Sequence, residues 1–335
     1  MPVPFPSIPA EWAPHAAIWT AWPSHADLWQ DNLEPARAEF AAMAKALAGP
    51  FGGQAGDRLK VLAHGPEALA SARDALGDCA EILPAAFGDI WLRDTGPIFA
   101  KAGLAHAFRF NGWGGKYVLP HDAELAAWLA ASAGAQLRRH DFVLEGGAIE
   151  FDGEGSVLTT RQCLLNANRN PGWDEARAEA ALRAALGVEA VLWLDEGLAN
   201  DHTDGHIDNL ARFVAPGRVV CQAPFGPDDP NAGVLEAIAR RLEGFIDARG
   251  RRLEVIRVPS PGLVPSEDGA PMPASHMNFV IGNASVVVPL YSESGEAAVR
   301  ALGALFPGRR TMGLGARALL SGGGAFHCIT QQEPS

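Results

Sequence analysis

The arrangement of the chain is indicated by three similar stretches of sequence, LEGGAIEF (144–151), TDGHIDNL (203–210) and SGGGAFHC (321–328). Each places glycine just before a short strand-like run that carries polar residues. A fourth stretch, DIWLRDTGPIF (89–99), is also polar but has its glycine after the charged pair. Similar strand starts that recur between helices are typical of a repeated supersecondary unit. We therefore expect ββαβ-like repeats arranged about an axis, each bringing polar residues to the centre.

Helical patterns fill the spaces between these stretches, because apolar residues recur there at helical spacing. The expected helices cover 33–48, 66–76, 122–132, 173–186, 233–250 and 295–306. Strand-like runs lie between them, some as hairpins such as ARFV-APG-RVVC and NFVI-GNA-SVVVP. This alternation predicts an α/β fold. No linker divides the chain, so we expect one domain over 1–335. The Pro/Gly-rich stretch at 259–276 predicts a long surface loop, either a lid or a plain excursion.

Composition and charge exclude several classes of function. The 335 residues are 48% hydrophobic and 20% charged, which indicates a folded globular protein. The net charge of -12 argues against a general nucleic-acid binder and mildly favours a cationic small substrate. The N-terminus lacks the pattern of a signal peptide, and no stretch of roughly 18 uncharged apolar residues follows. We therefore expect a cytoplasmic protein that does not span a membrane.

The four cysteines are Cys79, Cys163, Cys221 and Cys328, and none has a second cysteine within four residues. This spacing argues against a structural zinc site. Cys328 follows three glycines, whose backbone permits the close approach of a ligand. We therefore take Cys328 as the candidate nucleophile. The other three are explained as small core hydrophobes, which is the usual role of a free cysteine.

The densest cluster of ionisable residues lies at 201–209. If 206–213 is a strand, His206 and Asp208 point to the same face and can manage a proton and a positive charge together. A metal site made of His202, Asp204, His206 and Asp208 and a solvated polar loop are the two alternatives. His327 would face away from Cys328 on a strand, so His206 is the leading candidate for the base.

Two further carboxylates lie in apolar and glycine-rich runs, Asp94 in WLRDTGP and Glu145 in VLEGGAIE. Each has a structural alternative, a local ion pair or turn cap for Asp94 and an exposed strand end for Glu145. Trp91 and Trp113, the latter in FNGWGGKY (110–117), are candidate pocket walls, because aromatic faces suit a cation. Core packing is the alternative for both tryptophans.

Together these motifs resemble the agmatine deiminases and the broader family that includes the bacterial-type peptidylarginine deiminases. The matching stretches are WLRDTGP, FNGWGGKY, LEGGAIEFDGEGSVLTT, CLLNANRNP, DGHIDN and GGGAFHCITQQ, which extend over essentially the whole chain. The resemblance implies a five-fold pseudosymmetric α/β propeller. It also implies hydrolytic deimination of a small cationic guanidino substrate, with agmatine as the expected one. By the same resemblance, the reaction needs no metal or organic cofactor. A homodimer is compatible with it.

The resemblance also implies roles for individual residues. Cys328 would be the nucleophile that forms a covalent amidino-cysteine, and His206 would be the acid and base. Asp94 and Asp208 would bind the guanidinium group, and Glu145 would take part in the proton handling of the histidine. A guanidinium carbon is a poor electrophile, so it needs paired carboxylates to fix its plane and a thiolate to attack it.

The sequence departs from the agmatine deiminase pattern at two places. The expected GDEDTNGHIDN reads ANDHTDGHIDN (199–209), with His202 and Asp204 in place of Asp and Asn, and the insertion after WGG is absent. These differences leave the catalytic set intact but leave open what holds the far end of the substrate. The main alternative is therefore deimination of arginine, peptidyl-arginine or another guanidino compound, or transfer of the amidino group to another acceptor. A metal-dependent hydrolase and a non-catalytic guanidine-binding protein are the other two.

Overall fold

Five small β-sheets organise the part of the chain that the structure describes. In the computed structural model, residues 8–335 form a mixed α/β fold in which none of these sheets is closed into a barrel. Four sheets have three strands in the same order, with an antiparallel first pair and a parallel second pair. These sheets are β4 (Ile98–Ala100), β5 (Leu104–Arg109) and β6 (Gln136–Val143); β7 (Ile149–Phe151), β8 (Ser156–Thr160) and β9 (Ala190–Leu194); β10 (Ala211–Ala215), β11 (Arg218–Ala223) and β12 (Glu254–Pro259); and β13 (Val280–Ile281), β14 (Ser285–Leu290) and β15 (Arg310–Gly315).

The fifth sheet joins the two ends of the chain. It contains β16 (Thr330–Pro334), β1 (His15–Ala21), β2 (Leu59–Ala63) and β3 (Ala80–Pro84), in that order. The C-terminal strand β16 pairs antiparallel with β1, and β2 and β3 continue the sheet in parallel. Antiparallel pairing followed by parallel pairing is therefore the arrangement here too, although the antiparallel strands come from opposite ends of the sequence.

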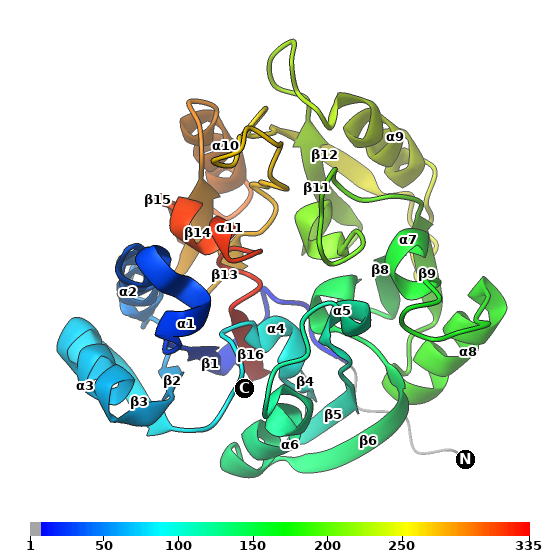
Figure 1. The fold of residues 1–335 in the computed structure, drawn as a ribbon. Coiled ribbons are helices and arrows are strands. Elements are labelled where there is room, and N and C mark those ends of the chain that lie inside the picture. Colours follow the sequence, from blue (N-terminus) through cyan, green and yellow to red (C-terminus); the bar gives the residue numbers. More distant parts are fainter. Residues whose placement is uncertain (1–7) are drawn as a thin grey trace.

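A helix connects each parallel pair of strands, as the alternation of the sequence predicts. These helices are α2 (Leu33–Ala48), α3 (Gly65–Leu76), α6 (Asp122–Ser132), α8 (Glu175–Leu186), α9 (Ala232–Glu243) and α10 (Gly295–Gly303). The shorter ones are α1 (Ala26–Trp29), α4 (Leu92–Thr95), α5 (Gly112–Gly115), α7 (Arg161–Leu164), α11 (Arg317–Ser321) and the 3₁₀ turns η1 (Gln30–Asn32), η2 (Gly77–Cys79), η3 (Gly146–Ala148) and η4 (Ile207–Asn209). Figure 1 shows the sheets around a common centre, with α4 and α5 near it and α3, α8 and α9 at the periphery.

Local sequence explains where these helices begin and end. The side chain of Asp174 accepts a hydrogen bond from the Arg177 amide at the start of α8, and Gly187 ends that helix at a φ of 69°. The helix expected at 233–250 stops at Glu243 instead. The reason lies in the next turn, where Asp247 accepts the amides of Arg249 and Arg251, so the backbone bonds a side chain rather than continuing the helix.

The polar stretches of the sequence lie just before the first strand of their sheets. The α4 turn precedes β4, η3 precedes β7, η4 precedes β10, and a turn region at 326–329 precedes β16. The expectation that 206–213 is one strand is therefore wrong for its first half, because 207–209 is a 3₁₀ turn. The His206 amide donates to the Thr203 hydroxyl, and Gly205 has a φ of 84°. This local bonding turns the chain before β10 begins.

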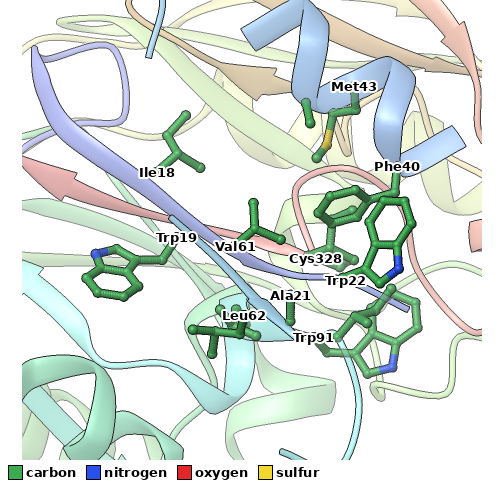
Figure 2. Packing of buried hydrophobic residues seen from close by; sticks show 14 of the residues in the cluster. Ile18, Trp19, Ala21, Trp22, Phe40, Met43, Val61, Leu62, Trp91 and Cys328 are labelled. Atoms are coloured by element: carbon green, nitrogen blue, oxygen red, sulfur yellow. The ribbon is translucent and has the colours of Figure 1, made fainter. Parts of the chain in front are cut away.

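The largest hydrophobic cluster reaches from the outer helices to the centre of the molecule. Trp22 and Phe40 meet edge to face, with their ring centroids 5.2 Å apart. Cys328 and Trp91 belong to the same cluster, and Figure 2 shows them among its side chains. The candidate nucleophile therefore lies where a packed core ends, and such a core holds its side chains in fixed rotamers.

The Pro/Gly-rich loop leaves the surface at its C-terminal end. Residues 265–270 are mostly exposed, as expected of a surface loop, whereas Ala274, Ser275 and His276 are buried. The Pro271 carbonyl accepts a hydrogen bond from Asn200, so the loop contacts the segment that leads to His206. Its function as a lid stays a prediction.

Within residues 8–335, no helix is both long enough and apolar enough to cross a membrane.

Candidate active site

Three side chains converge on the backbone at Gly147. A Cβ atom added to this glycine would lie 2.5 Å from His206 Nδ1, 2.9 Å from Asp94 Oδ1 and 3.1 Å from Asp208 Oδ2. Any larger residue would therefore collide with all three groups. The glycine pair in LEGGAIE, visible in the sequence, serves this close approach. It shows that residues from three separate stretches, each lying before a different strand, meet at one point.

Asp94 is held by two hydrogen bonds that fix its carboxylate. The indole nitrogen of Trp113 donates to Oδ2 at 2.8 Å, and the Gly147 amide donates to Oδ1 at 2.8 Å. Burial raises the pKa of Asp94, and the nearby His206 acts in the opposite direction. The alternative of a turn cap within 93–96 does not describe these contacts, since both come from distant segments. Trp113 itself has a φ of 54°, next to glycines on both sides.

His206 is completely buried, and its Nδ1 lies 3.8 Å from Asp94 Oδ2. Neither ring nitrogen has a nitrogen or oxygen hydrogen-bond partner among the described residues. The thiol of Cys163 interacts with the ring instead. Burial disfavours the imidazolium, but Asp94, Cys163 and Glu145 outweigh burial and raise the pKa of His206 well above its ordinary value. This direction favours the charged imidazolium, which is able to give up a proton.

Cys328 lies next to Asp208 and to an asparagine that sequence reasoning did not single out. Its Sγ is 3.7 Å from Asp208 Oδ2 and 3.1 Å from the side-chain nitrogen of Asn278. Asn278 Oδ1 also accepts the amides of His327 and Cys328. Burial, Asp208 and Asp94 raise the pKa of Cys328 well above its ordinary value. This direction favours the neutral thiol over the thiolate.

Asn278 completes a pattern that the sequence shows only in part. It lies two residues before β13, the first strand of its sheet. All five sheets thus have site residues just before their first strand, with Asp94, Glu145, His206, Asn278 and Cys328 in the five positions. Asn278 escaped notice because ASHMNFVIG lacks the glycine found at the other strand starts. The hairpin that follows it was the available signal.

Trp91 lies beside Cys328. A Cβ atom on Gly324 would lie 2.7 Å from the Trp91 ring and 3.0 Å from Cys328 Sγ, which places the ring beside the thiol. The indole nitrogen of Trp91 donates to Asp89, a buried carboxylate that also accepts the indole of Trp29. Asp89 thereby fixes the ring orientation. Trp91 is both a core residue and a neighbour of the candidate nucleophile.

Glu145 is buried and ion-paired rather than exposed at a strand end. Its Oε1 accepts from Arg169 Nε at 2.6 Å, and both side chains are 1% exposed. Ligand atoms of Glu145, Cys163 and His206 lie within 4.8 Å of one another, so the carboxylate is close to the imidazole. Cys163 is therefore not only a core hydrophobe, because it lines this group. Arg169 lies in the CLLNANRNP stretch, where an arginine among apolar and amide residues was an available signal.

Arg169 is expected to be important for stability. Replacement by methionine keeps most of the side-chain volume but leaves Glu145 buried without its cation. Breaking a buried ion pair in this way costs about 3–5 kcal/mol of unfolding free energy. Urea denaturation followed by circular dichroism measures this loss. The matched control is Arg218→Met, which breaks an exposed pair with Glu254 and should change stability by less than about 1 kcal/mol. Equal losses in the two variants would contradict this assignment.

His202 and Asp204 turn away from His206 and Asp208. Asp204 accepts from Lys116 and Arg169, each at 2.6 Å, and the His202 ring bonds and stacks on Tyr117. The metal site proposed for His202, Asp204, His206 and Asp208 is therefore not assembled, since two of its four members bond elsewhere. These contacts instead connect the segment before His206 to the loop that carries Trp113.

Comparison with known proteins identifies the family of this chain. The sequence model of the Porphyromonas-type peptidyl-arginine deiminase family matches residues 7–334. The chain belongs to this family. Among its curated relatives, agmatine deiminase of Stutzerimonas stutzeri is 39% identical, over 98% of this chain and 95% of that protein. Agmatine deiminase of Pseudomonas aeruginosa (strain LESB58) is 38% identical over the same shares.

Solved structures of the family have the same fold. Agmatine deiminase of Enterococcus faecalis superposes with a TM-score of 0.90 at 31% identity, covering 98% of this chain and 96% of that one. A cysteine-to-serine variant of Campylobacter jejuni agmatine deiminase with substrate bound superposes with a TM-score of 0.87 at 27% identity, again over 98% and 96%. The recognition of the family from sequence motifs is thus confirmed, and so is the mixed α/β class.

Proposed function

We propose that this protein hydrolyses the guanidinium group of agmatine to N-carbamoylputrescine and ammonia, through a covalent intermediate on Cys328. The observation that carries the proposal is the convergence of a thiol, an imidazolium and two carboxylates around Gly147. The choice of substrate is supported by relatives named agmatine deiminase, which match this chain over nearly their full length. We also propose that the chain is a single domain over 1–335 and a five-fold pseudosymmetric α/β propeller. The similar strand starts of the five sheets support both proposals.

The two carboxylates would hold the substrate. Asp94 and Asp208 face the same space, and Asp208 Oδ1 is buried without a hydrogen-bond partner among the described residues. A guanidinium group offers N–H donors in a plane, so it can bond both carboxylates at once and fix that plane. Trp91 and Trp113 would form the walls. The Asp94 carboxylate would keep its bond from Trp113 while it binds the cation.

The bound cation would also activate the nucleophile. With the site empty, Asp208 and Asp94 disfavour the Cys328 thiolate and raise the pKa of Cys328. A guanidinium group held by both carboxylates neutralises that effect, so the thiol can lose its proton to solvent as the substrate binds. The thiolate then attacks the guanidinium carbon, a C–S bond forms, and the three-fold planar carbon becomes tetrahedral.

His206 would act first as an acid and then as a base. Its imidazolium gives a proton to the departing nitrogen, the C–N bond breaks, and ammonia leaves an amidino-cysteine behind. The neutral imidazole next takes a proton from water, which attacks the same carbon. The C–S bond then breaks, and the urea-containing product leaves with the thiolate restored. Glu145, near the ring and fixed by Arg169, would stabilise the charged form.

Ammonia release is the experiment that tests this function. Agmatine, arginine and a blocked peptidyl-arginine are compared side by side, with and without EDTA. Fast release from agmatine that EDTA does not change is the expected result. Release only from one of the other guanidines would keep the chemistry and change the substrate, in line with the departures at His202 and Asp204. Loss of activity with EDTA would favour a metal hydrolase, and silence with all three would favour a binding protein.

The raised pKa of Cys328 gives a prediction for the protein without substrate. Iodoacetamide reacts with the thiolate, so we expect alkylation of Cys328 to be slow at neutral pH and to accelerate well above pH 9. Mass spectrometry of the peptide that contains Cys328 follows the reaction separately from that of Cys79, the partly exposed cysteine. A rate that has already reached its plateau at pH 7 would contradict this prediction.

The cytoplasmic location and the homodimer stay predictions.

A further inference from the structure

A chain of buried ionisable side chains begins at Asp208 and continues through His327 to Glu11. His327 is 1% exposed and precedes the candidate nucleophile. Its Nδ1 lies 2.8 Å from Asp208 Oδ2, and its Nε2 lies 2.9 Å from Glu11 Oε2. The His327 ring was expected to face away from the site on a strand. It instead lies in a turn, where it bridges the carboxylate proposed to bind substrate and a residue 316 positions away.

Both neighbours of His327 are carboxylates that can only accept hydrogen bonds. Glu11 also accepts from Arg212 and from the Ile281 amide. Burial disfavours a charged Glu11, but Arg212 and His327 outweigh it, and the pKa of Glu11 lies well below its ordinary value. Burial likewise opposes the ionisation of Asp208, and His327 prevails there too, so the pKa of Asp208 is lowered. Ionised carboxylates carry no proton. With both carboxylates ionised, each ring nitrogen of His327 can bond its neighbour only by donating.

Arg212 fixes the far end of this chain of charges. It is fully buried and donates to Glu11 and to Glu150, the latter at 3.0 Å. It also donates to the carbonyls of Met277 and Phe279, which flank Asn278. The charges therefore alternate from Asp208 through His327, Glu11 and Arg212 to Glu150. Glu11, in the middle of this chain, lies in the segment before β1. We predicted no site residue in that part of the sequence.

We propose that His327 is a positioning residue, an imidazolium that is clamped between Asp208 and Glu11 and holds Asp208 ionised and correctly oriented for a guanidinium ligand. The proposal rests on the proposed function for the identity of that ligand. Its geometric consequence is specific. His327 bonds Oδ2 of Asp208, the oxygen that also lies 3.7 Å from Cys328 Sγ, whereas Oδ1 is buried without a hydrogen-bond partner among the described residues. A small rotation of the carboxylate would lose the bond to His327, so the acceptor for the substrate has a single direction.

A positive charge on His327 matters because the other groups around Asp208 include both acidic and cationic side chains. Asp94 and the Cys328 sulfur are acidic neighbours, and His206 and Arg212 are cationic ones. On the Glu11 side, Arg93 and Glu150 face the same network. Removal of the imidazolium would leave two buried carboxylates with fewer cations between them. Asp208 would then bind a proton at higher pH and bind a guanidinium less well.

Two neutral replacements separate the two bonds of His327. His327→Asn places an amide near the position of Nδ1 and keeps a donor toward Asp208. His327→Gln places the amide near Nε2 and keeps the donor toward Glu11. Both lose the charge, so the acidic limb of the kcat/KM profile should move up by about one pH unit in each. At neutral pH we expect kcat/KM for agmatine to fall about 10-fold in the Asn variant and at least about 100-fold in the Gln variant, mainly through KM.

The control is His276→Asn, which alters another fully buried histidine. His276 bonds the Pro259 carbonyl and contacts neither carboxylate, so the acidic limb should stay in place. Urea denaturation of all three variants shows whether they fold. Equal losses in the Asn and Gln variants with an unmoved acidic limb would reduce His327 to a structural residue and overturn the proposal.

A second measurement does not depend on activity. The ¹⁵N spectrum of the imidazole groups in the full-length protein at neutral pH should show one histidine with both ring nitrogens protonated that disappears in both His327 variants. A neutral tautomer for His327 would overturn the proposal whatever the substrate. If the wild-type protein released no ammonia from any guanidine, the proposed function would fail, and this spectrum would still decide whether the clamp exists.

Discussion

Replacement of Cys328 by alanine is expected to abolish ammonia release from agmatine, with a fall in kcat of at least about 10⁴-fold. In the proposed mechanism the Cys328 thiolate forms the bond to the guanidinium carbon, and alanine removes that path entirely. Binding should survive, because Asp94, Asp208 and the two tryptophans remain. Isothermal calorimetry with agmatine therefore measures a dissociation constant in this variant that turnover prevents in the wild type.

The matched control for this prediction is Cys221→Ala. Cys221 is also fully buried, in β11, but it packs in a different hydrophobic cluster from that of Cys328. This variant should keep more than about half of the wild-type rate, since a surface or core change away from the site alters stability and not chemistry. In acid-quenched wild-type protein, a mass increase equal to agmatine less ammonia should map to the Cys328 peptide. Near-normal turnover without Cys328 would reject a covalent mechanism.

The fold could be predicted from the sequence because its signals are local. Glycine before a polar strand start, apolar residues at helical spacing and short turns all lie within a few residues of each other, and α2, α3 and α6 begin and end close to their expected bounds. The failures are local as well. The strand expected at 206–213 and the end of the helix expected at 233–250 were both changed by side chains, Thr203 and Asp247, that bond the backbone and compete with regular structure.

The composition of the site could be predicted only where a residue lies in a distinctive motif. Cys328, His206 and the three carboxylates each lie within four residues of a glycine, and the structure brings them together. Asn278, Arg169 and Glu11 were missed, because their contacts join segments that are distant in sequence and no local pattern marks them. The strand interpretation of His327 was a reasonable inference from spacing, but its pairing with Asp208 depends on a turn that only the tertiary structure specifies.

Asp94→Asn is expected to lower kcat/KM for agmatine by about 10³-fold, through two effects that one substitution combines. The first is loss of a negative charge from the proposed guanidinium site. The second is a conflict of donors. Oδ1 accepts from the Gly147 amide and Oδ2 from the Trp113 indole, so the NH₂ group of asparagine faces an N–H in either orientation. The variant should therefore bind agmatine weakly even when it is folded.

The pH dependence of the Asp94→Asn variant distinguishes its effect on His206 from its effect on substrate. Burial lowers the pKa of His206, and Asp94 is the strongest of the groups that raise it. Loss of Asp94 should lower this pKa, so the imidazolium would disappear at lower pH. The alkaline limb of the kcat/KM profile should then move down. Asp152→Asn is the control, because Asp152 is buried but only accepts amides in the turn between β7 and β8. A lower rate with an unmoved alkaline limb would mean that Asp94 binds substrate without tuning His206. A rate close to that of the control would remove Asp94 from the site altogether.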